Sequence, residues 1–237
     1  MVLFAQLSFF VPSLPAYVNL LMLRARHQIG NTTLTNFVHQ NDLPADVVFS
    51  GSVAVDSETM GLNPHRDNLC VVQLSSGDGD AHLVQLNRET YDAPHLKKLL
   101  ADTSVLKIFH FARFDVAVFK KYLNVETTPI YCTKIASKLC RTYTDRHGLK
   151  DVCRELAGVE LSKQQQSSDW GAAELTPAQR DYAASDVLHL HKVKARLDDM
   201  LAREGRTSLA AACFDFLPTR AALDLEGWPE ADIFSHS

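Results

Sequence analysis

The chain has 237 residues, of which 46% are hydrophobic and 22% charged, with a formal net charge of −4. This composition fits one sizeable globular domain with appendages and argues against a protein that coats nucleic acid through bulk positive charge, although a local basic groove remains compatible with it. The five cysteines are an odd number without a Cys-x-x-Cys pair, which fits neither a disulfide framework nor a zinc knuckle. We therefore expect reduced and mostly buried cysteines.

The first part of the chain is apolar. Residues 1–23 carry no charged side chain, and Arg24 and Arg26 follow the apolar run instead of preceding it, so the positive region of a secretory signal is missing. We expect residues 1–30 to be a leader that is either disordered or a mis-assigned start, with Met22 as an alternative first residue. A peripheral membrane contact is the other interpretation, and no stable membrane association is expected.

Short apolar runs separated by Gly, Asp, Asn and Ser then predict a meander of strands. These runs are Val47–Phe49, Val53–Val55, Cys70–Leu74 and His82–Leu86. A short helix after Pro94 is expected to precede a buried strand at Val105–Phe109. This alternation of strands and helices predicts an α/β layer fold.

Two carboxylates, Asp56 and Glu58, directly follow the apolar run Val53–Val55. Alternate residues of a strand share one face, so both side chains converge on one point. Packing gives no reason to place two like charges together, because each raises the pKa of the other, whereas a divalent ion such as Mg²⁺ takes such oxygen ligands. The alternative is a solvated strand end that runs into a turn at Gly61.

Two later helices supply further acidic residues. Asp115 falls in the first turn of the helix after the buried strand, where a carboxylate suits the helix dipole, so an ordinary helix-start preference is the alternative. Thr176-Pro177 opens the longest predicted helix, through Leu197. Tyr182 and Asp186 lie one turn apart on one face of it. The alternative there is a core aromatic beside a surface charge.

Basic and amide side chains gather in the middle of the chain. The stretch from Cys132 to Arg154 is its most basic part, which makes it a candidate for phosphate contacts or, alternatively, a solvated helix face. The polar loop from Lys163 to Trp170 has no periodicity. It is expected either to order against a substrate or to be a flexible connector.

These residues resemble, one by one, the four-carboxylate-plus-tyrosine pattern of the ribonuclease D-like 3′–5′ exonucleases over about residues 33–205. Within that superfamily the chain is most similar to the nano-RNase C family. The resembling stretches are Pro64–Gly77, Cys132–Leu139, Arg141–Leu149, Leu161–Trp170, Tyr182–Asp186 and Gly227–Ser237. Two features depart from the pattern: residues 1–30 have no counterpart, and Ser57 stands where the family commonly has Thr.

The resemblance implies a ribonuclease H-like exonuclease fold of the α/β class, with a mixed central sheet flanked by helices. The exonuclease domain is expected at residues 31–205. Residues 206–237 are expected to form a C-terminal tail that docks on the core or on a neighbouring subunit, because they are too apolar to be left in water. A ring-like homo-oligomer such as an octamer, and a cytoplasmic location, are also implied.

The implied activity is metal-dependent 3′–5′ hydrolysis of very short RNA, especially 5′-phosphorylated dinucleotides, to 5′-mononucleotides. Two Mg²⁺ or Mn²⁺ ions are expected on Asp56, Glu58, Asp115 and Asp186, with Tyr182 orienting the attacking water. The expected substrate contacts are Thr59, Leu62, His110, Phe111, Lys163 and Gln166. Leu62 is the expected wedge between bases, with a core leucine as its alternative, and buried aromatics are the alternative for His110 and Phe111.

Two rival functions remain open at this point. One is a 3′–5′ exonuclease that acts on DNA or longer RNA, because a metal site recognises phosphate geometry and does not itself distinguish sugars. The other is a non-catalytic nucleic-acid-binding protein on the same fold, against which the intact set of acidic residues argues. Very short RNA is favoured because barely thirty residues follow the helix of Asp186, too few for a further nucleic-acid-binding domain.

Overall fold

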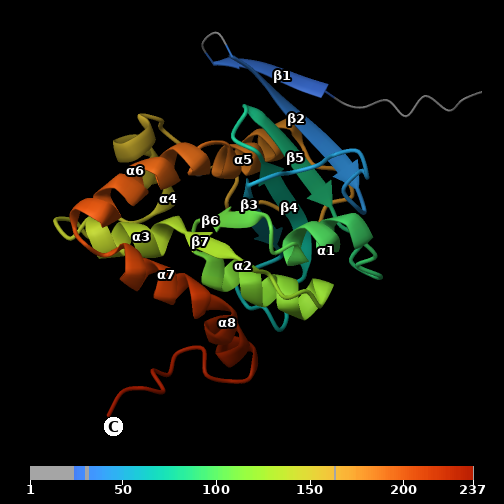
Figure 1. Ribbon diagram of the computed structural model, residues 1–237. Coiled ribbons are helices and arrows are strands. Elements are labelled where there is room, and N and C mark those ends of the chain that lie inside the picture. Colours follow the sequence, from blue (N-terminus) through green and yellow to red (C-terminus); the bar gives the residue numbers. More distant parts are fainter. Residues whose placement is uncertain (1–23, 30–31, 163, 237) are drawn as a thin grey trace, which may run out of the picture.

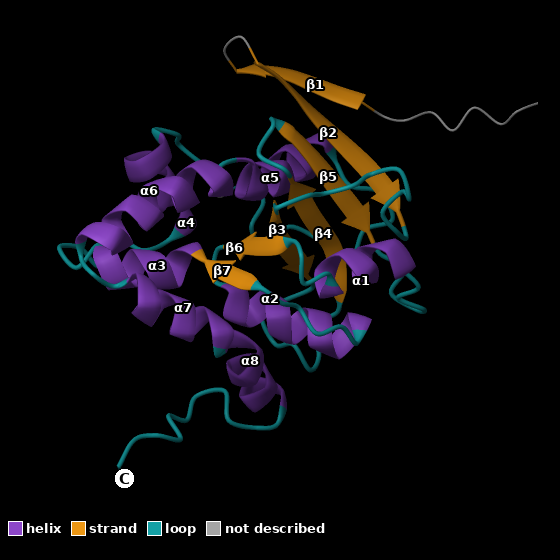
Figure 2. Ribbon diagram, viewed as in Figure 1, coloured by secondary structure: helices purple, strands orange, loops and turns teal. Residues whose placement is uncertain are grey.

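The computed structural model describes residues 24–29, 32–162 and 164–236. In this part of the chain a seven-stranded mixed sheet is flanked by helices (Figure 1 and Figure 2). The strands are β1 Arg24–Ile29, β2 Thr32–Gln40, β3 Ser52–Thr59, β4 Leu69–Ser75, β5 Asp80–Gln85, β6 Leu106–Phe109 and β7 Ile130–Cys132. The α-helices are α1 Pro94–Ala101, α2 Ala112–Val118, α3 Thr133–Cys140, α4 Leu149–Val152, α5 Pro177–Leu188, α6 Leu190–Arg203, α7 Thr207–Asp215 and α8 Leu217–Leu225. The predicted α/β layer fold is confirmed.

Strand β3 lies inside the sheet, whose order is β1-β2-β5-β4-β3-β6-β7. It pairs antiparallel with β4 and parallel with β6, so both of its edges are hydrogen-bonded. The first residues of the strand, Val53, Ala54 and Val55, are fully buried. This position fixes the direction of the side chains that follow, because a strand paired on both sides cannot slip in register without exposing its apolar residues.

Helices α5 and α2 lie against opposite faces of β3. Asp56 and Glu58 point toward Asp186 on α5, and Ser57, which alternates to the other face, contacts Asp115 on α2. Each helix begins where its sequence predicts. Thr176 caps α5 in a reciprocal capping box with Gln179.

Two of the predicted elements are wrong. Val47–Phe49 is not a strand: the chain turns there, with the Val47 amide donating to the Pro44 carbonyl at 3.1 Å, and Val48 is 81% exposed. The single helix predicted after Pro177 is two helices, because α5 ends at Leu188 and α6 begins at Leu190, with His189 between them at φ −107° and ψ −4°. The apolar pattern passes through this break because both helices bury residues in one core.

Three further expectations concern the cysteines, the leader at residues 1–30 and membrane association. All five cysteines are free and four are buried, as predicted. Residues 24–29, assigned above to the leader, form β1, whereas residues 1–23 lie outside the described part, so the rest of that expectation stays a prediction. Within the described residues, none of the helices has both the length and the apolar character that crossing a lipid bilayer requires.

The C-terminal residues begin as two helices packed on the rest of the chain. Asp224 on α8 accepts hydrogen bonds from Arg113 on α2, at 2.6 and 2.7 Å, and from Arg220 at 2.7 Å. The side chains beyond α8 are more exposed, with Trp228 at 47% and Phe234 at 75%. The domain boundaries drawn from the sequence stay predictions.

Candidate active site

A cavity of about 740 Å³ opens over the second half of β3. Its lining comes from β3 and the turn after it, from the start of α2, from α3, from the start of α4, from the polar loop before α5 and from α5 itself. Most of the residues that the sequence analysis singled out line this cavity: Asp56, Glu58, Thr59, Leu62, His110, Phe111, Asp115, Gln166, Tyr182 and Asp186.

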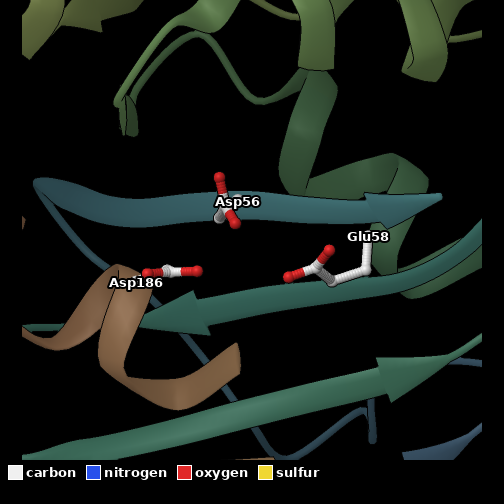
Figure 3. A group of neighbouring side chains, drawn as sticks. All are labelled: Asp56, Glu58 and Asp186. Atoms are coloured by element: carbon white, nitrogen blue, oxygen red, sulfur yellow. The ribbon is translucent and has the colours of Figure 1, made fainter. Parts of the chain in front are cut away.

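Three carboxylates meet in this cavity. Asp56 and Glu58 project from one face of β3, and Asp186 approaches them from α5 (Figure 3). One oxygen of each lies within 4.8 Å of the others. The period of two along the strand and the packing of α5 on that face together produce the cluster, as the sequence predicted.

Asp115 lies beside this group rather than within it. Its side chain is buried, and the Ser57 hydroxyl donates to Asp115 Oδ1 at 2.6 Å. Its negative charge acts on both Asp56 and Glu58 and raises their pKa values. The structure thus brings all four predicted acidic residues to one cavity. The fourth, Asp115, is held by the hydrogen bond from Ser57 on β3.

Burial and mutual repulsion make these carboxyl groups hard to ionise. Burial, followed by the charges of the neighbouring carboxylates, raises the pKa values of Asp56 and Glu58 well above their ordinary range. Burial also raises the pKa of Asp115 to about 7, against the hydrogen bond from Ser57. It raises the pKa of Asp186 to about 7, against a side-chain hydrogen bond with Tyr182.

The donor set fits a hard divalent cation. The neighbouring charges that most affect the pKa values of Asp56 and Glu58 are those of other carboxylates. Carboxylate oxygens are the ligands that Mg²⁺ and Mn²⁺ prefer. A cation at this point removes the repulsion that the fold has built.

Tyr182 stands next to the carboxylates, one helical turn before Asp186. Burial, and then the charges of Asp186, Glu58 and Asp56, raise the pKa of its phenol, so the hydroxyl keeps its proton at neutral pH. The ring packs at a centroid distance of 6.0 Å from Trp170, which is 2% exposed. The phenol is therefore held as a neutral hydrogen-bonding group at the edge of the cluster.

The turn after β3 carries two of the predicted substrate contacts. Leu62 is 86% exposed at the rim of the cavity, so the alternative of a core leucine is wrong. The Thr59 hydroxyl donates to the Gly61 carbonyl at the base of that turn. Both side chains lie where a ligand in the cavity would meet them, and their roles stay proposals.

His110 and Phe111 form a wall where β6 leads into α2. Phe111 is 44% exposed, its backbone is left-handed at φ 74°, and the Lys134 ammonium lies 4.1 Å from its ring centroid. A non-glycine residue held in this conformation is uncommon and strained. Burial lowers the pKa of His110 to about 3, so this ring is neutral, with Nδ1 2.9 Å from Thr133 Oγ1. The alternative of a buried aromatic therefore fails for Phe111.

The polar loop before α5 closes another side of the cavity. Gln166 is exposed and lines it, whereas Lys163 lies outside the described residues. The end of the loop is anchored, because Gln179 on α5 donates to Ser168 Oγ at 3.1 Å and to the Asp169 carbonyl at 3.0 Å.

The basic stretch divides into two kinds of residue. Lys134 and Lys150 line the cavity. Arg141 is fully buried and donates to Ser137, to the Arg146 carbonyl and to Glu155, so it is neither a solvated residue nor a phosphate contact. The sequence pattern did not separate these roles, because spacing along the chain does not show which basic residue is buried against a partner such as Glu155.

A family model described as 3′–5′ exonuclease matches residues 33–202. The chain belongs to the 3′–5′ exonuclease family. The predicted ribonuclease D-like exonuclease is thereby confirmed. Ribonuclease D from Granulibacter bethesdensis is 36% identical over 154 residues, which are 65% of this chain and 38% of that protein. The exonuclease thus spans about two fifths of the length of the curated relatives that it matches.

Solved structures of related proteins resemble the chain over most of its length. NrnC from Brucella melitensis bound to pGG is 59% identical, with a TM-score of 0.82, and the match covers 84% of this chain and 98% of that one. The same protein with bound Mg²⁺ is 58% identical with a TM-score of 0.81 over the same shares. Escherichia coli RNase D is 26% identical with a TM-score of 0.63, over 73% of this chain and 45% of that one. The expected exonuclease fold and the likeness to nano-RNase C are confirmed.

Three residues that line the cavity of this exonuclease were not predicted. Ser57 was noted only as a departure from the family pattern, and no local signal indicates that it holds Asp115 from 58 residues away. Met60 is 54% exposed between Thr59 and Leu62. Phe114 precedes Asp115 and faces the cavity on α2. Their neighbours in sequence are the only signal that could have identified the last two.

The raised carboxyl pKa values predict an unusual pH dependence for the metal-free exonuclease. The folded pKa of Asp186 is about 7 against 3.8 for an exposed group, so between these values the folded chain holds protons that the unfolded chain has released. In EDTA, the urea midpoint should therefore fall as pH rises from about 5 to about 8. Excess Mn²⁺ should reverse this trend, because ions bind only ionised ligands.

The control is Asp186→Asn, which cannot ionise at this position and should weaken the pH dependence in EDTA. A midpoint that rises with pH in the metal-free protein would contradict the electrostatic account of the cluster.

Proposed function

We propose that the chain is a metal-dependent 3′–5′ exoribonuclease that hydrolyses very short RNA, above all 5′-phosphorylated dinucleotides, to 5′-mononucleotides. The observation that carries this proposal is the group of three carboxylates, with oxygens within 4.8 Å of one another, in a cavity of about 740 Å³. NrnC, which is 59% identical over 84% of this chain, has been solved bound to the dinucleotide pGG. A cytoplasmic location belongs to the same proposal, because all five cysteines are free.

Asp56, Glu58 and Asp186 would hold the ions directly, and Asp115 would complete the site from the position that Ser57 gives it. Bound Mg²⁺ or Mn²⁺ would supply charge neutralisation for the scissile phosphate and for the 3′ oxygen that leaves, and would make a water molecule more acidic. The carboxylates therefore act as ligands and not as bases. Their ionisation near neutral pH depends on the ions that they bind.

Tyr182 is placed to orient the attacking water. Its hydroxyl keeps its proton, so it donates to or accepts from a water molecule without carrying charge. That water attacks the phosphorus atom, the bond between phosphorus and the 3′ oxygen breaks, and the terminal nucleotide leaves with a 5′ phosphate. Alignment of the water is the contribution of the protein to this step.

The rim of the cavity suits a short ligand. Leu62 offers an exposed apolar side chain for a base, and the Thr59 hydroxyl lies near where a terminal ribose would sit. Lys134 and Lys150 add positive charge to the same cavity for a 5′ phosphate. Gln166 from the polar loop, and His110 with Phe111, would close the remaining sides.

We further propose that the chain forms a homo-oligomer. Apolar side chains are exposed just before α8 and beyond its end: Phe216 at 38%, Trp228 at 47%, Ile233 at 48% and Phe234 at 75%. The rings of Phe216 and Phe234 lie together, with a centroid distance of 6.0 Å. Exposed apolar groups of this kind favour a protein partner, and a second copy of the chain is the simplest one. The mass of the protein in solution tests this proposal.

The length of the preferred RNA tests the proposed substrate. A 5′-phosphorylated dinucleotide should be cleaved with a higher kcat/KM than RNA of about seven nucleotides, because extra nucleotides gain no contacts and lose the enclosed 5′ phosphate. Labelled RNA and DNA of graded length, resolved at early times with Mn²⁺, give this comparison. Rates that rise steadily with length would show a general exonuclease, and equal cleavage of DNA would remove the selectivity for RNA. Asp56→Asn is the inactive control.

The role of Tyr182 is tested by Tyr182→Phe. This change keeps the ring beside Trp170 and removes only the hydroxyl, so kcat should fall by about 100-fold or more while KM changes little. Single-turnover kinetics at saturating Mn²⁺ measure the effect. A loss of affinity with unchanged chemistry would instead make Tyr182 a substrate contact.

A further inference from the structure

The turn that carries Leu62 is held by a carboxylate outside the metal cluster. This turn, residues 60–68 and hereafter the Leu62 turn, joins β3 to β4. Leu62 itself is 86% exposed, so packing does not fix it. Asp67, near the end of the turn, is only 7% exposed although it carries a charge. Because the charged Asp67 is buried while the apolar Leu62 in the same turn is exposed, Asp67 is the candidate for the residue that holds the turn.

Asp67 and Asn63 bind each other through two hydrogen bonds in opposite directions. Asp67 Oδ2 accepts from the Asn63 backbone N–H at 2.9 Å, and the Asn63 carbonyl accepts from the Asp67 N–H at 2.8 Å. At the base of the turn, the Met60 N–H donates to the Asn68 carbonyl at 3.0 Å. The loop between these two closures contains Leu62, so its backbone has little freedom.

The Asp67 carboxylate also packs directly on the residue before Leu62. A Cβ atom built at Gly61 would lie 2.2 Å from Asp67 Oδ2, far inside van der Waals contact. Only glycine permits this approach. The carboxylate therefore sets the position of the backbone on both sides of Leu62, at Gly61 by contact and at Asn63 by a hydrogen bond.

Arg66 is the other hydrogen-bond partner of Asp67, but it contributes less to holding the turn. Its Nε and Nη2 donate to the carboxylate at 2.6 and 2.9 Å, but its side chain is 76% exposed. An ion pair in water contributes little to stability. Arg66 thus offers a control that removes the ion pair and leaves the contacts of Asp67 with Gly61 and Asn63 in place.

We propose that Asp67 is a positioning residue that fixes the Leu62 turn, so that Leu62 meets a base of the short RNA without first having to be ordered. This inference rests on the proposed function, because it assumes that Leu62 contacts the substrate. A turn that is ordered before binding avoids the entropy loss of ordering on binding. Asp67 therefore determines substrate affinity without touching substrate.

The test compares Asp67→Ala with Asp67→Asn and Arg66→Ala. Asp67→Ala should raise KM for a 5′-phosphorylated dinucleotide about tenfold with kcat unchanged, as expected when a contact with a base is weakened. Asp67→Asn keeps an oxygen that can accept from Asn63 and should restore most of the affinity. Arg66→Ala should behave as the unmodified enzyme.

A double-mutant cycle then asks whether Asp67 acts through Leu62. Leu62→Ala alone should raise KM, and adding Asp67→Ala should raise it no further, because the side chain that Asp67 positions is already gone. Effects that multiply in full would overturn the proposal. Gly61→Ala is a second route to the same displacement, because its methyl group collides with Asp67, and it should raise KM as Asp67→Ala does.

Hydrogen exchange of the backbone amides in residues 60–68 separates this inference from the proposed function. Asp67→Ala should speed exchange of the Asn63 amide while the amides of β3 and β4 exchange at their original rates. Unchanged exchange at Asn63 would overturn the inference whatever the substrate is. A wild-type enzyme without preference for dinucleotides would instead contradict the proposed function, and the exchange result would still decide whether Asp67 holds the turn.

Discussion

Repulsion among buried carboxylates is the constraint on which the rest of this structure depends. Asp56, Glu58 and Asp186 are held within 4.8 Å by a strand paired on both edges and by a helix with a reciprocal cap. Burial raises the pKa of all three carboxyl groups, and the charges of the neighbouring carboxylates raise the pKa values of Asp56 and Glu58 further. The ionised cluster therefore costs stability unless a proton or a cation neutralises it, and a bound divalent cation does so without removing the charges of the ligands.

The sequence predicted those parts of the site that depend on local periodicity. Alternation along a strand was enough to put Asp56 and Glu58 on one face, and the spacing of one helical turn was enough to pair Tyr182 with Asp186. The hydrogen bond from Ser57 to Asp115 spans 58 positions and follows only from the packing of α2 on the sheet. The family resemblance identified Asp115 as an expected metal ligand, but it did not indicate that Ser57 holds this side chain.

The sequence predictions failed where the outcome depends on tertiary contacts that composition and charge do not show. Val47–Phe49 has the composition of a strand, but no neighbouring strand pairs with it in the described residues, and composition does not encode pairing. Arg141 has the charge of a phosphate ligand, yet it is buried against Glu155. By contrast, Leu62 and Phe111 are exposed apolar residues on turns, and the family resemblance identified both for their place beside the acidic residues.

The proposed function requires this cluster to bind two divalent ions beside the end of a short RNA. Anomalous diffraction from crystals of the protein grown with Mn²⁺ and a non-hydrolysable 5′-phosphorylated dinucleotide tests it most directly. The account predicts two anomalous peaks in the cavity, in contact with Asp56, Glu58 and Asp186, and with the scissile phosphate next to them. An absence of peaks at these carboxylates while the dinucleotide occupies the cavity would contradict it.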